Sequence, residues 1–371
     1  MRDVTTILDA RESGSRLRFR STVVPVPGDK GSTIFFTGSR HYRVKADPVL
    51  ASLVDKLVHG FDSATLVSAV VEEGLDPRRV VAVLEHMAAV GLLFEERRRP
   101  DHAASSRYAR QLDLFGLAET NDVSRFDMQD RLRSAHVAQI GLGGLGTWIA
   151  LGLAPTGIGR LTLIDGDVVA RSNLNRQVLY SDAEVGATKV SAAGRRLHEV
   201  NPDVVVEGRA SYVDSAVSAD RLIPPCDLLI VSADEPFLRI RTWVTEVCQV
   251  RRIPHVFVAA GGVGPLVEPG GADACWACLE VRARTVLPEL DSVVGVLEAI
   301  DRPRHPQPIT PGYHPLLAGA VVLEAIRYCS GFESPATRGA QLVWEGASST
   351  MARHEIPTAA ECPHHTRHVA A

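Results

Sequence analysis

The 371-residue sequence lacks several features that would assign it quickly to a class. Aromatic residues make up only 5% of it, so its core must be built mainly from Val, Leu, Ile and Ala, as in parallel strands buried on both faces. No apolar run is long enough to cross a membrane, and the N-terminus has no apolar segment of the signal-peptide type. We therefore expect a cytoplasmic protein with no membrane partner.

An excess of positive charge is also missing. The formal net charge of −4 gives no general reason to expect nucleic-acid binding. The six cysteines do not suggest a disulfide framework in a chain of this length, and two of them form a Cys-x-x-Cys pair, which suits a reducing compartment and one metal site. The length and the 45% hydrophobic content suit a globular protein of two domains.

Residues 1–97 are expected to form a small α+β domain. β-branched and aromatic residues alternate with polar ones through residues 18–45, which predicts three short strands. Three helical segments follow, two of which start at the Asp-Pro pairs of Asp47 and Asp76. This order suggests a winged-helix-like domain. Residues 98–107 contain charged and then small polar residues and are expected to be a linker.

From residue 108 onward, apolar β-rich runs alternate with helical segments. This alternation predicts an α/β fold, a Rossmann-like and mostly parallel sheet with helices on both faces. The expected strands are HVAQIG, RLTLID, DVVVEGRA, DLLIVSA and IPHVFVAA, with helices over 144–156, 188–200 and 236–250. A buried helix, HPLLAGAVVLEAIRYCSG, and two closing strands, AQLVWEG and MARHEIP, are expected to complete the domain.

A glycine-rich turn follows the first of these strands. The motif GLGGLG places Gly141, Gly143 and Gly146 in G-x-G-x-x-G spacing, with Gly144 in the same turn. Such a turn lets a phosphate approach backbone N–H groups, and the next helix N-terminus adds partial positive charge. Asp165 ends the next strand, where a carboxylate can accept the ribose hydroxyls. The pattern predicts an adenine nucleotide; glycines that serve only helix–sheet packing are the alternative.

The loop after the second strand favours a triphosphate over a dinucleotide. Arg and Lys side chains that converge on one loop are what a triphosphate requires, whereas the pyrophosphate bridge of NAD needs less positive charge. The polar residues of the loop DGDVVARSNLNRQ and of the helix start after it are Asp167, Asn173, Arg176, Gln177 and Lys189.

Asp234, in the motif SADEP, ends the strand DLLIVSA. Ligands of open α/β sheets bind at the carboxyl ends of the strands, and a lone carboxylate that faces phosphates is a natural Mg²⁺ ligand. A helix N-cap ahead of Pro236 is the alternative role, and one side chain can serve both. The expected cofactors are therefore ATP and Mg²⁺.

Six motifs together resemble those of the ThiF/MoeB/HesA superfamily, the ubiquitin-activating-enzyme-like adenylating enzymes. In the order and spacing of that family the chain has RYARQ, GLGGLG, DGDVV, NLNRQ, GATK and SADEP. The resemblance implies that a carboxylate attacks the α-phosphate of ATP and yields an acyl-adenylate and pyrophosphate. It also implies that Arg110, in RYARQ, reaches the γ-phosphate in a neighbouring subunit, which predicts a homodimer.

The same resemblance assigns the remaining site residues. The glycines would line the phosphates, Asp165 would hold the ribose, and Asp234 would hold Mg²⁺ beside the α-phosphate. The triphosphate ligands would be Asn173, Arg176, Gln177 and Lys189.

A structural zinc site is expected near the C-terminus. Cys275 and Cys278, in CWAC, have the spacing of zinc ligands, and the tail ECPHH offers Cys362 and His365. The related family usually has a second Cys-x-x-Cys there, so a histidine replaces a cysteine in this interpretation, with His364 as the near alternative. The other possibility is a pair of buried cysteines and a solvated tail.

A cysteine is missing where many relatives carry one that takes the acyl group as a thioester. The matching segment, residues 281–314, has none, and Cys226, Cys248 and Cys329 are interpreted as small core residues. We therefore expect adenylation without an enzyme thioester. His305 and His314 are candidate substrate contacts in this segment, although a loop histidine is more often incidental.

The N-terminal domain resembles the peptide-clamp, or recognition-element, domain of ribosomal-peptide-modifying enzymes. Its last helix has only Arg78 and Arg79 against Asp76 and Glu85, too few cations to read nucleic acid. With the adenylating domain it resembles the microcin-C-type and pantocin-type enzymes. The predicted function is ATP- and Mg²⁺-dependent adenylation of a carboxylate on a ribosomally synthesised precursor peptide. Two alternatives are a leader-binding scaffold for a cyclodehydratase, with a vestigial ATP site, and activation of a ThiS/MoaD-like sulfur carrier.

Overall fold

The structure is a computed structural model of the chain, which divides into two compact units, Met1–Gln129 and Asp130–Ala371. The residues described are 16–20, 23–37, 40–45, 47–62, 65–96, 107–120, 122–236, 239–259, 261–299 and 312–365. Most of the expected linker lies outside them.

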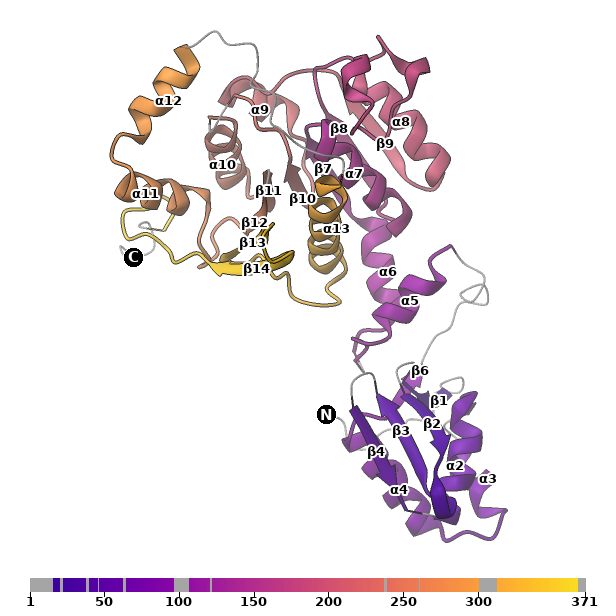
Figure 1. Cartoon of the computed structure of the whole chain (residues 1–371). Coiled ribbons are helices and arrows are strands. Elements are labelled where there is room, and N and C mark those ends of the chain that lie inside the picture. The colour runs from indigo at the N-terminus through magenta and orange to yellow at the C-terminus, as the bar shows by residue number, and fades with distance from the viewer. Residues whose placement is uncertain are drawn as a thin grey trace. The chain divides into compact units, whose positions relative to one another are not determined.

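The N-terminal unit contains two antiparallel three-stranded sheets and a set of helices (Figure 1). One sheet has the order β5 (Phe61–Asp62), β1 (Arg16–Phe19), β6 (Leu93–Glu96), and the other the order β2 (Val23–Pro27), β3 (Thr33–Thr37), β4 (Arg40–Val44). The helices α2 (Pro48–Val58), α3 (Leu66–Val71) and α4 (Pro77–Ala89) coincide with the three helical segments expected from the sequence. The strands β5 and β6 were not predicted.

Local sequence explains where these helices begin. The Asp47 side chain accepts hydrogen bonds from the backbone N–H groups of Val49 and Leu50, and Asp76 accepts one from Arg78. Each aspartate therefore caps a helix whose first residue is proline. The apolar faces of the helices bury Leu53, Leu57, Val80 and Leu84 completely, together with Phe35 of β3.

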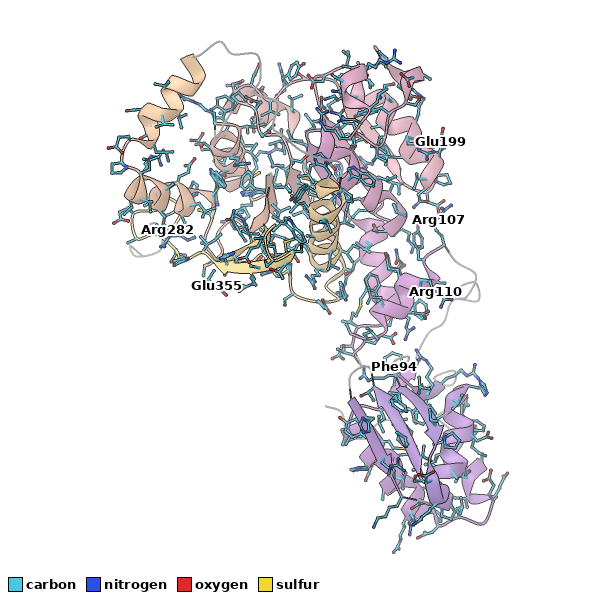
Figure 2. All side chains as sticks on the ribbon, viewed as in Figure 1. Phe94, Arg107, Arg110, Glu199, Arg282 and Glu355 are labelled. Carbon is cyan, nitrogen blue, oxygen red and sulfur yellow. The ribbon has the colours of Figure 1, made fainter. Side chains whose placement is uncertain are left out.

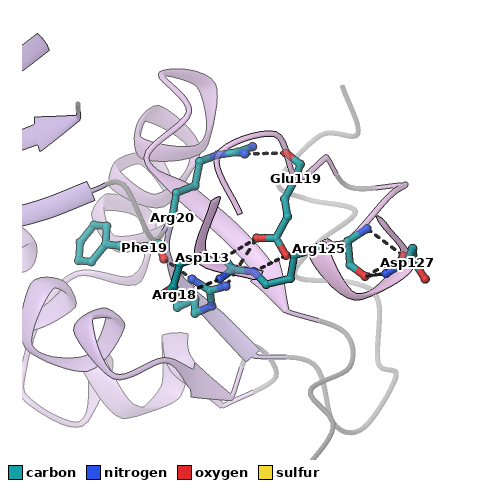
Figure 3. Close-up of polar contacts among 8 residues, drawn as sticks. Arg18, Phe19, Arg20, Asp113, Glu119, Arg125 and Asp127 are labelled. Carbon is teal, nitrogen blue, oxygen red and sulfur yellow. Dashed lines mark hydrogen bonds and ion pairs between the residues drawn. The ribbon is translucent and has the colours of Figure 1, made fainter. Parts of the chain in front are cut away.

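Residues after the expected linker also pack in the N-terminal unit. The Arg125 guanidinium donates to both oxygens of the buried Glu119 carboxylate, at 2.9 and 2.7 Å, and the Arg20 guanidinium donates to the Glu119 carbonyl at 2.7 Å (Figure 3). Bidentate pairing of this kind fixes orientation as well as distance. It holds the segment that follows α5 (Ala109–Phe115) against the chain just after β1. Residues 108–129, expected in the second domain, thus belong to the first compact unit.

The second unit is built on an eight-stranded sheet in the order β14-β13-β12-β11-β10-β7-β8-β9. The strands are β7 (His136–Ile140), β8 (Arg160–Ile164), β9 (Val205–Arg209), β10 (Leu228–Val231), β11 (His255–Ala259), β12 (Gly262–Val267), β13 (Ala340–Glu345) and β14 (Thr350–Glu355). The run from β11 to β9 is parallel, and β12, β13 and β14 extend it in antiparallel pairing. The predicted mostly parallel α/β sheet is confirmed.

Helices cover the sheet on both faces (Figure 1). Helix α7 (Gly144–Leu153) packs with α13 (Tyr313–Ser330), and α9 (Ala216–Leu222) packs with α10 (Arg239–Arg251). The buried Ile140, Leu229 and Val231 share a core with Ile240 and Val244 of α10. The structure also describes the helices α6 (Arg125–Ser134), α8 (Lys189–Val200), α11 (Trp276–Val286) and α12 (Leu290–Ala299).

The strand order places a crevice at β7. The chain continues from β7 to β8 on one side, whereas β10 pairs with β7 on the other, so the order reverses at this strand. Ligands of open α/β sheets bind where the order reverses, outside the carboxyl ends of the strands. Within the described ranges, no helix has both the length and the apolarity that a membrane span requires.

Candidate active site

A cavity of about 600 Å³ opens at the carboxyl ends of β7, β8 and β10. Most of the residues predicted to bind the nucleotide line it, although they come from segments far apart in the sequence. These are Gly141, Gly143, Gly144, Asp165, Asp167, Asn173, Arg176, Gln177, Lys189 and Asp234. The predicted residues absent from the lining are Gly146 and Arg110.

The glycines of the turn have different roles. Gly141 has a φ of +96°, and a Cβ there would lie 2.7 Å from the backbone nitrogen of Ala233, so glycine is required. Gly143 precedes α7, and no atom lies within 4 Å of the Cβ position, so the backbone is open to the cavity. A Cβ on Gly146 would lie 2.1 Å from the Gly141 carbonyl oxygen. Gly146 therefore allows α7 to approach the turn, and Gly143 and Gly144 face the ligand space.

Asp165 organises the same turn. Its carboxylate accepts a hydrogen bond from the Leu142 N–H at 2.6 Å and another from the Asp167 N–H at 2.8 Å. Each carboxylate oxygen can accept a further hydrogen bond. The side chain can thus hold the loop and still accept a ribose hydroxyl.

Lys189 is the most enclosed cation of the cavity. Its ammonium lies 2.7 Å from the Asp167 carboxylate, and only 6% of its side chain is exposed. The hydroxyl of Tyr212 donates to the other oxygen of Asp167 at 2.7 Å, and the Tyr212 ring covers Gly166. Tyr212 lines the cavity but was not predicted, because no motif surrounds it in the sequence.

Backbone contacts hold the loop that carries Arg176. The Arg176 guanidinium donates to the Ser172 carbonyl oxygen at 2.9 Å, and the Asn173 side chain accepts from the Ala170 N–H at 3.0 Å. Gln177 is 3% exposed, and its side-chain oxygen has no hydrogen-bond partner. The loop therefore presents a cation and a buried amide to the cavity.

Asp234 lies at the end of β10 and makes no hydrogen bond or ion pair with any described residue. The Arg241 guanidinium, which stacks on the Trp276 ring at 4.8 Å, is near enough to interact with it electrostatically. Burial lowers the pKa of Arg241, and the negative charge of Asp234 opposes that shift. The Asp234 carboxylate is free to bind a ligand, as a Mg²⁺ site requires.

The four predicted zinc ligands also come together. The ligand atoms of Cys275, Cys278, Cys362 and His365 all lie within 4.8 Å of one another, and the three cysteines are buried. The Cys275 sulfur is 4.0 Å from that of Cys278 and 3.5 Å from that of Cys362. Three sulfurs and one imidazole at this spacing fit a tetrahedral zinc ion. His364 is close too, with Nδ1 3.4 Å from the Cys275 sulfur.

Comparison with known proteins assigns the family. The model of the ThiF family matches residues 108–364, which is more than half of the chain. The chain belongs to the ThiF family. Among curated proteins, it is 32% identical to the molybdopterin-synthase adenylyltransferase of Escherichia coli (60% of this chain, 89% of that one). It is 29% identical to the sulfur carrier protein ThiS adenylyltransferase of the same organism (69% and 93%).

A solved structure covers more of the chain than these ThiF-family relatives do. E. coli MccB, crystallised with MccA-N7isoASN, superposes with a TM-score of 0.73 over 94% of this chain and 99% of its own. At 20% identity this likeness establishes the fold only. The ThiF match begins at residue 108, so the N-terminal strands and helices are additional to the family domain.

Arg110, the predicted γ-phosphate residue, belongs to the first compact unit, whereas the cavity belongs to the second. It lies on α5 in the N-terminal unit, and 98% of its side chain is exposed (Figure 2). Its one ion pair among the described residues is a 3.6 Å contact with Asp113, also exposed.

The other three cysteines belong neither to the lining of the cavity nor to the metal cluster. Burial raises the pKa of Cys226, Cys248 and Cys329 to about 12, so each is a neutral thiol at physiological pH. Cys248 lies in the core between the sheet and α10. Of the two candidate histidines, His314 lines the cavity, whereas His305 lies outside the described residues.

Proposed function

We propose that this protein uses ATP and Mg²⁺ to adenylate a carboxylate of a ribosomally synthesised precursor peptide. Adenylyl transfer from ATP is the activity of the family, and the chain is an ATP-dependent adenylyltransferase. The observation that carries the proposal is the single cavity that combines the glycine turn, Lys189, Arg176 and the free carboxylate of Asp234. A vestigial site in a binding scaffold would not need all of them.

The proposed chemistry needs little from the protein beyond position and charge. An oxygen of the substrate carboxylate attacks the α-phosphorus of ATP and forms a new P–O bond. The bond from that phosphorus to the bridging oxygen breaks, and pyrophosphate leaves with the electron pair. No proton moves in this step. Lys189, Arg176 and the N-terminus of α7 stabilise the charge of the triphosphate and hold it in line with the carboxylate.

The residues present fit both expected metals. Asp234, which makes no hydrogen bond or ion pair with a described residue, would hold Mg²⁺, whose charge would neutralise the phosphate oxygens. Cys275, Cys278, Cys362 and His365 would hold a structural zinc ion, because thiolate and imidazole suit that metal and no position is left open for a substrate.

The N-terminal unit supports a peptide as the substrate. It adds two small antiparallel sheets to the family domain, and an added peptide strand is a common way for such sheets to bind a partner. The superposition with MccB includes this region, because it covers 94% of the chain, and MccB is a microcin C7 biosynthetic enzyme whose structure has been solved in complex with N-formylated MccA. We infer that the N-terminal unit binds the leader of the precursor.

Activation of a sulfur carrier is the second candidate. It is favoured by the 32% and 29% identity to adenylyltransferases of molybdopterin synthase and of ThiS. The additional N-terminal unit and the lack of a cysteine in residues 281–314 favour the peptide.

ATP–pyrophosphate exchange separates the two candidates. The full-length protein is incubated with Mg²⁺, ATP, labelled pyrophosphate and either a short peptide encoded beside its gene or a carrier protein that ends in Gly-Gly. Exchange that depends on the peptide supports the proposal. Exchange that depends on the carrier alone would establish the second candidate, and no exchange with either would contradict both.

A further inference from the structure

His314 lines the cavity, and the sequence indicated it only as a candidate substrate contact. It lies in the first turn of α13, and its side chain is buried, with 4% of the residue exposed. Neither ring nitrogen has a hydrogen-bond partner within the described chain, and Nδ1 has no exposed surface, so Nε2 is the nitrogen that a ligand of the cavity can reach. A polar atom that lines a ligand cavity without a protein partner points to a contact that the ligand completes.

The position of the ring indicates which part of the ligand it faces. The Nε2 and Cε1 atoms lie 2.6 Å from where a Cβ on Gly144 would be, so the ring occupies the space that this glycine leaves empty. Gly144 begins α7, whose free N–H groups are suited to phosphate. Arg176 also lies near both Gly144 and His314. The imidazole therefore lies at the phosphate end of the cavity.

We propose that His314 binds the triphosphate of ATP by donating a hydrogen bond from its imidazole to a phosphoryl oxygen. The inference rests on ATP binding in this cavity but not on the peptide substrate. A neutral imidazole has one N–H donor for this contact. Burial, with a contribution from the nearby Arg176 charge, lowers the pKa of His314, which favours that neutral form.

The test measures nucleotide binding by calorimetry on the full-length protein, with Mg-ATP and adenosine as probes. His314→Phe keeps a ring in the space but removes the donor. We expect it to weaken ATP binding about 10- to 100-fold, the range for a hydrogen bond to a charged group, and to leave adenosine binding unchanged. His314→Gln, which restores an N–H donor, should recover much of the ATP affinity.

Tyr313→Phe is the matched control, because it removes a polar group from the neighbouring residue of α13, which does not line the cavity. His314→Leu replaces His314→Phe if the latter has an altered melting temperature. The inference would be overturned if the variants that lack the donor bound ATP as tightly as the unmodified protein. It would also be overturned if they lost as much affinity for adenosine as for ATP, because the ring would then only fill space. Failure of the unmodified protein to bind ATP would instead contradict adenylation itself.

Discussion

At the scale of single residues, the site contains side chains with contrasting contacts. The charges of Lys189 and Asp167 are already paired, whereas Asp234, just after β10, makes no hydrogen bond or ion pair with a described residue. Paired groups are held in position before the ligand arrives, and an unpaired carboxylate keeps its full capacity for a metal. Substitutions at these residues should therefore affect different steps.

Asp234→Ala should abolish ATP–pyrophosphate exchange and leave peptide binding unchanged. The change removes the proposed Mg²⁺ ligand, while the residues proposed to bind the leader lie in the other compact unit. Exchange is measured with labelled pyrophosphate, and peptide binding by fluorescence anisotropy. Glu235→Ala, which alters the adjacent cavity residue, is the control and should keep most of the activity. Loss of peptide binding with exchange intact would contradict this division of labour.

Glu324→Gln should lower the free energy of unfolding by about 2–4 kcal/mol, because the carboxylate is fully buried and accepts four hydrogen bonds. The backbone N–H groups of Ala336 and Thr337 donate to different oxygens of the carboxylate, so the amide nitrogen of glutamine would face a donor that it cannot accept from. Guanidinium-chloride unfolding of the second unit measures the change. Glu333→Gln is the control, because Glu333 is an exposed partner of Arg327, and it should change the free energy of unfolding by less than about 1 kcal/mol. Equal effects would refute the role given to burial.

At the scale of elements, the C-terminal tail is attached to the start of α11 by the cysteine cluster. The Ala359 N–H points to the Cys278 sulfur at 3.4 Å, and turns place Cys362 and His365 beside it. The tail is far from α11 in sequence, so a shared metal would stabilise their contact by closing a long loop.

Cys362→Ser should remove the bound zinc and lower the melting temperature, with little change in ATP affinity, because no member of the cluster lines the cavity. Zinc is measured by inductively coupled plasma mass spectrometry after the protein is purified without chelators. His365→Ala should lose zinc as well, whereas His364→Ala should retain it, although both imidazoles lie near the sulfurs. Zinc loss in His364→Ala alone would reverse that assignment, and the absence of zinc from the unmodified protein would refute the site.

At the scale of the whole molecule, the adenylating site is proposed to need two copies of the chain. The side chain of Arg110 is 98% exposed, and it lies in the motif that the family resemblance assigns to the γ-phosphate of a neighbouring subunit. The arginine of one copy would then complete the cavity of the other.

Complementation between inactive variants tests this arrangement. Arg110→Ala and Asp234→Ala should each be inactive, but mixed dimers of the two should recover up to half of the activity per dimer, because one of their two sites has both residues. Co-expression with two different tags isolates the mixed dimers for the exchange assay. Inactive mixed dimers would show that both residues act within one copy.

The sequence alone determined the type of sheet, the position of two carboxylates at the cavity and the presence of a possible metal cluster. The alternation of apolar runs and helical segments predicted the parallel sheet, because strands buried on both faces need continuous apolar residues. The strand-end positions of Asp165 and Asp234 placed both at the cavity, because the carboxyl ends of parallel strands meet at one edge. The spacing of Cys275 and Cys278 predicted a metal cluster, because its ligands must meet within a few ångströms.

Only the tertiary structure decided which motif residues face the cavity, which other residues line it and where the two compact units divide. Gly143 and Gly146 belong to one motif, yet only Gly143 faces the cavity, because the packing of α7 against the turn uses the space at Gly146. Tyr212 has no local signal, because its position depends on how distant segments pack, and of the candidates His305 and His314 only the structure showed that His314 lines the cavity. The boundary between the units also depends on a long-range contact, in which Arg20 and Arg125 hold Glu119 in the N-terminal unit. Spacing along a chain determines local geometry, whereas contacts between distant segments depend on the packed fold.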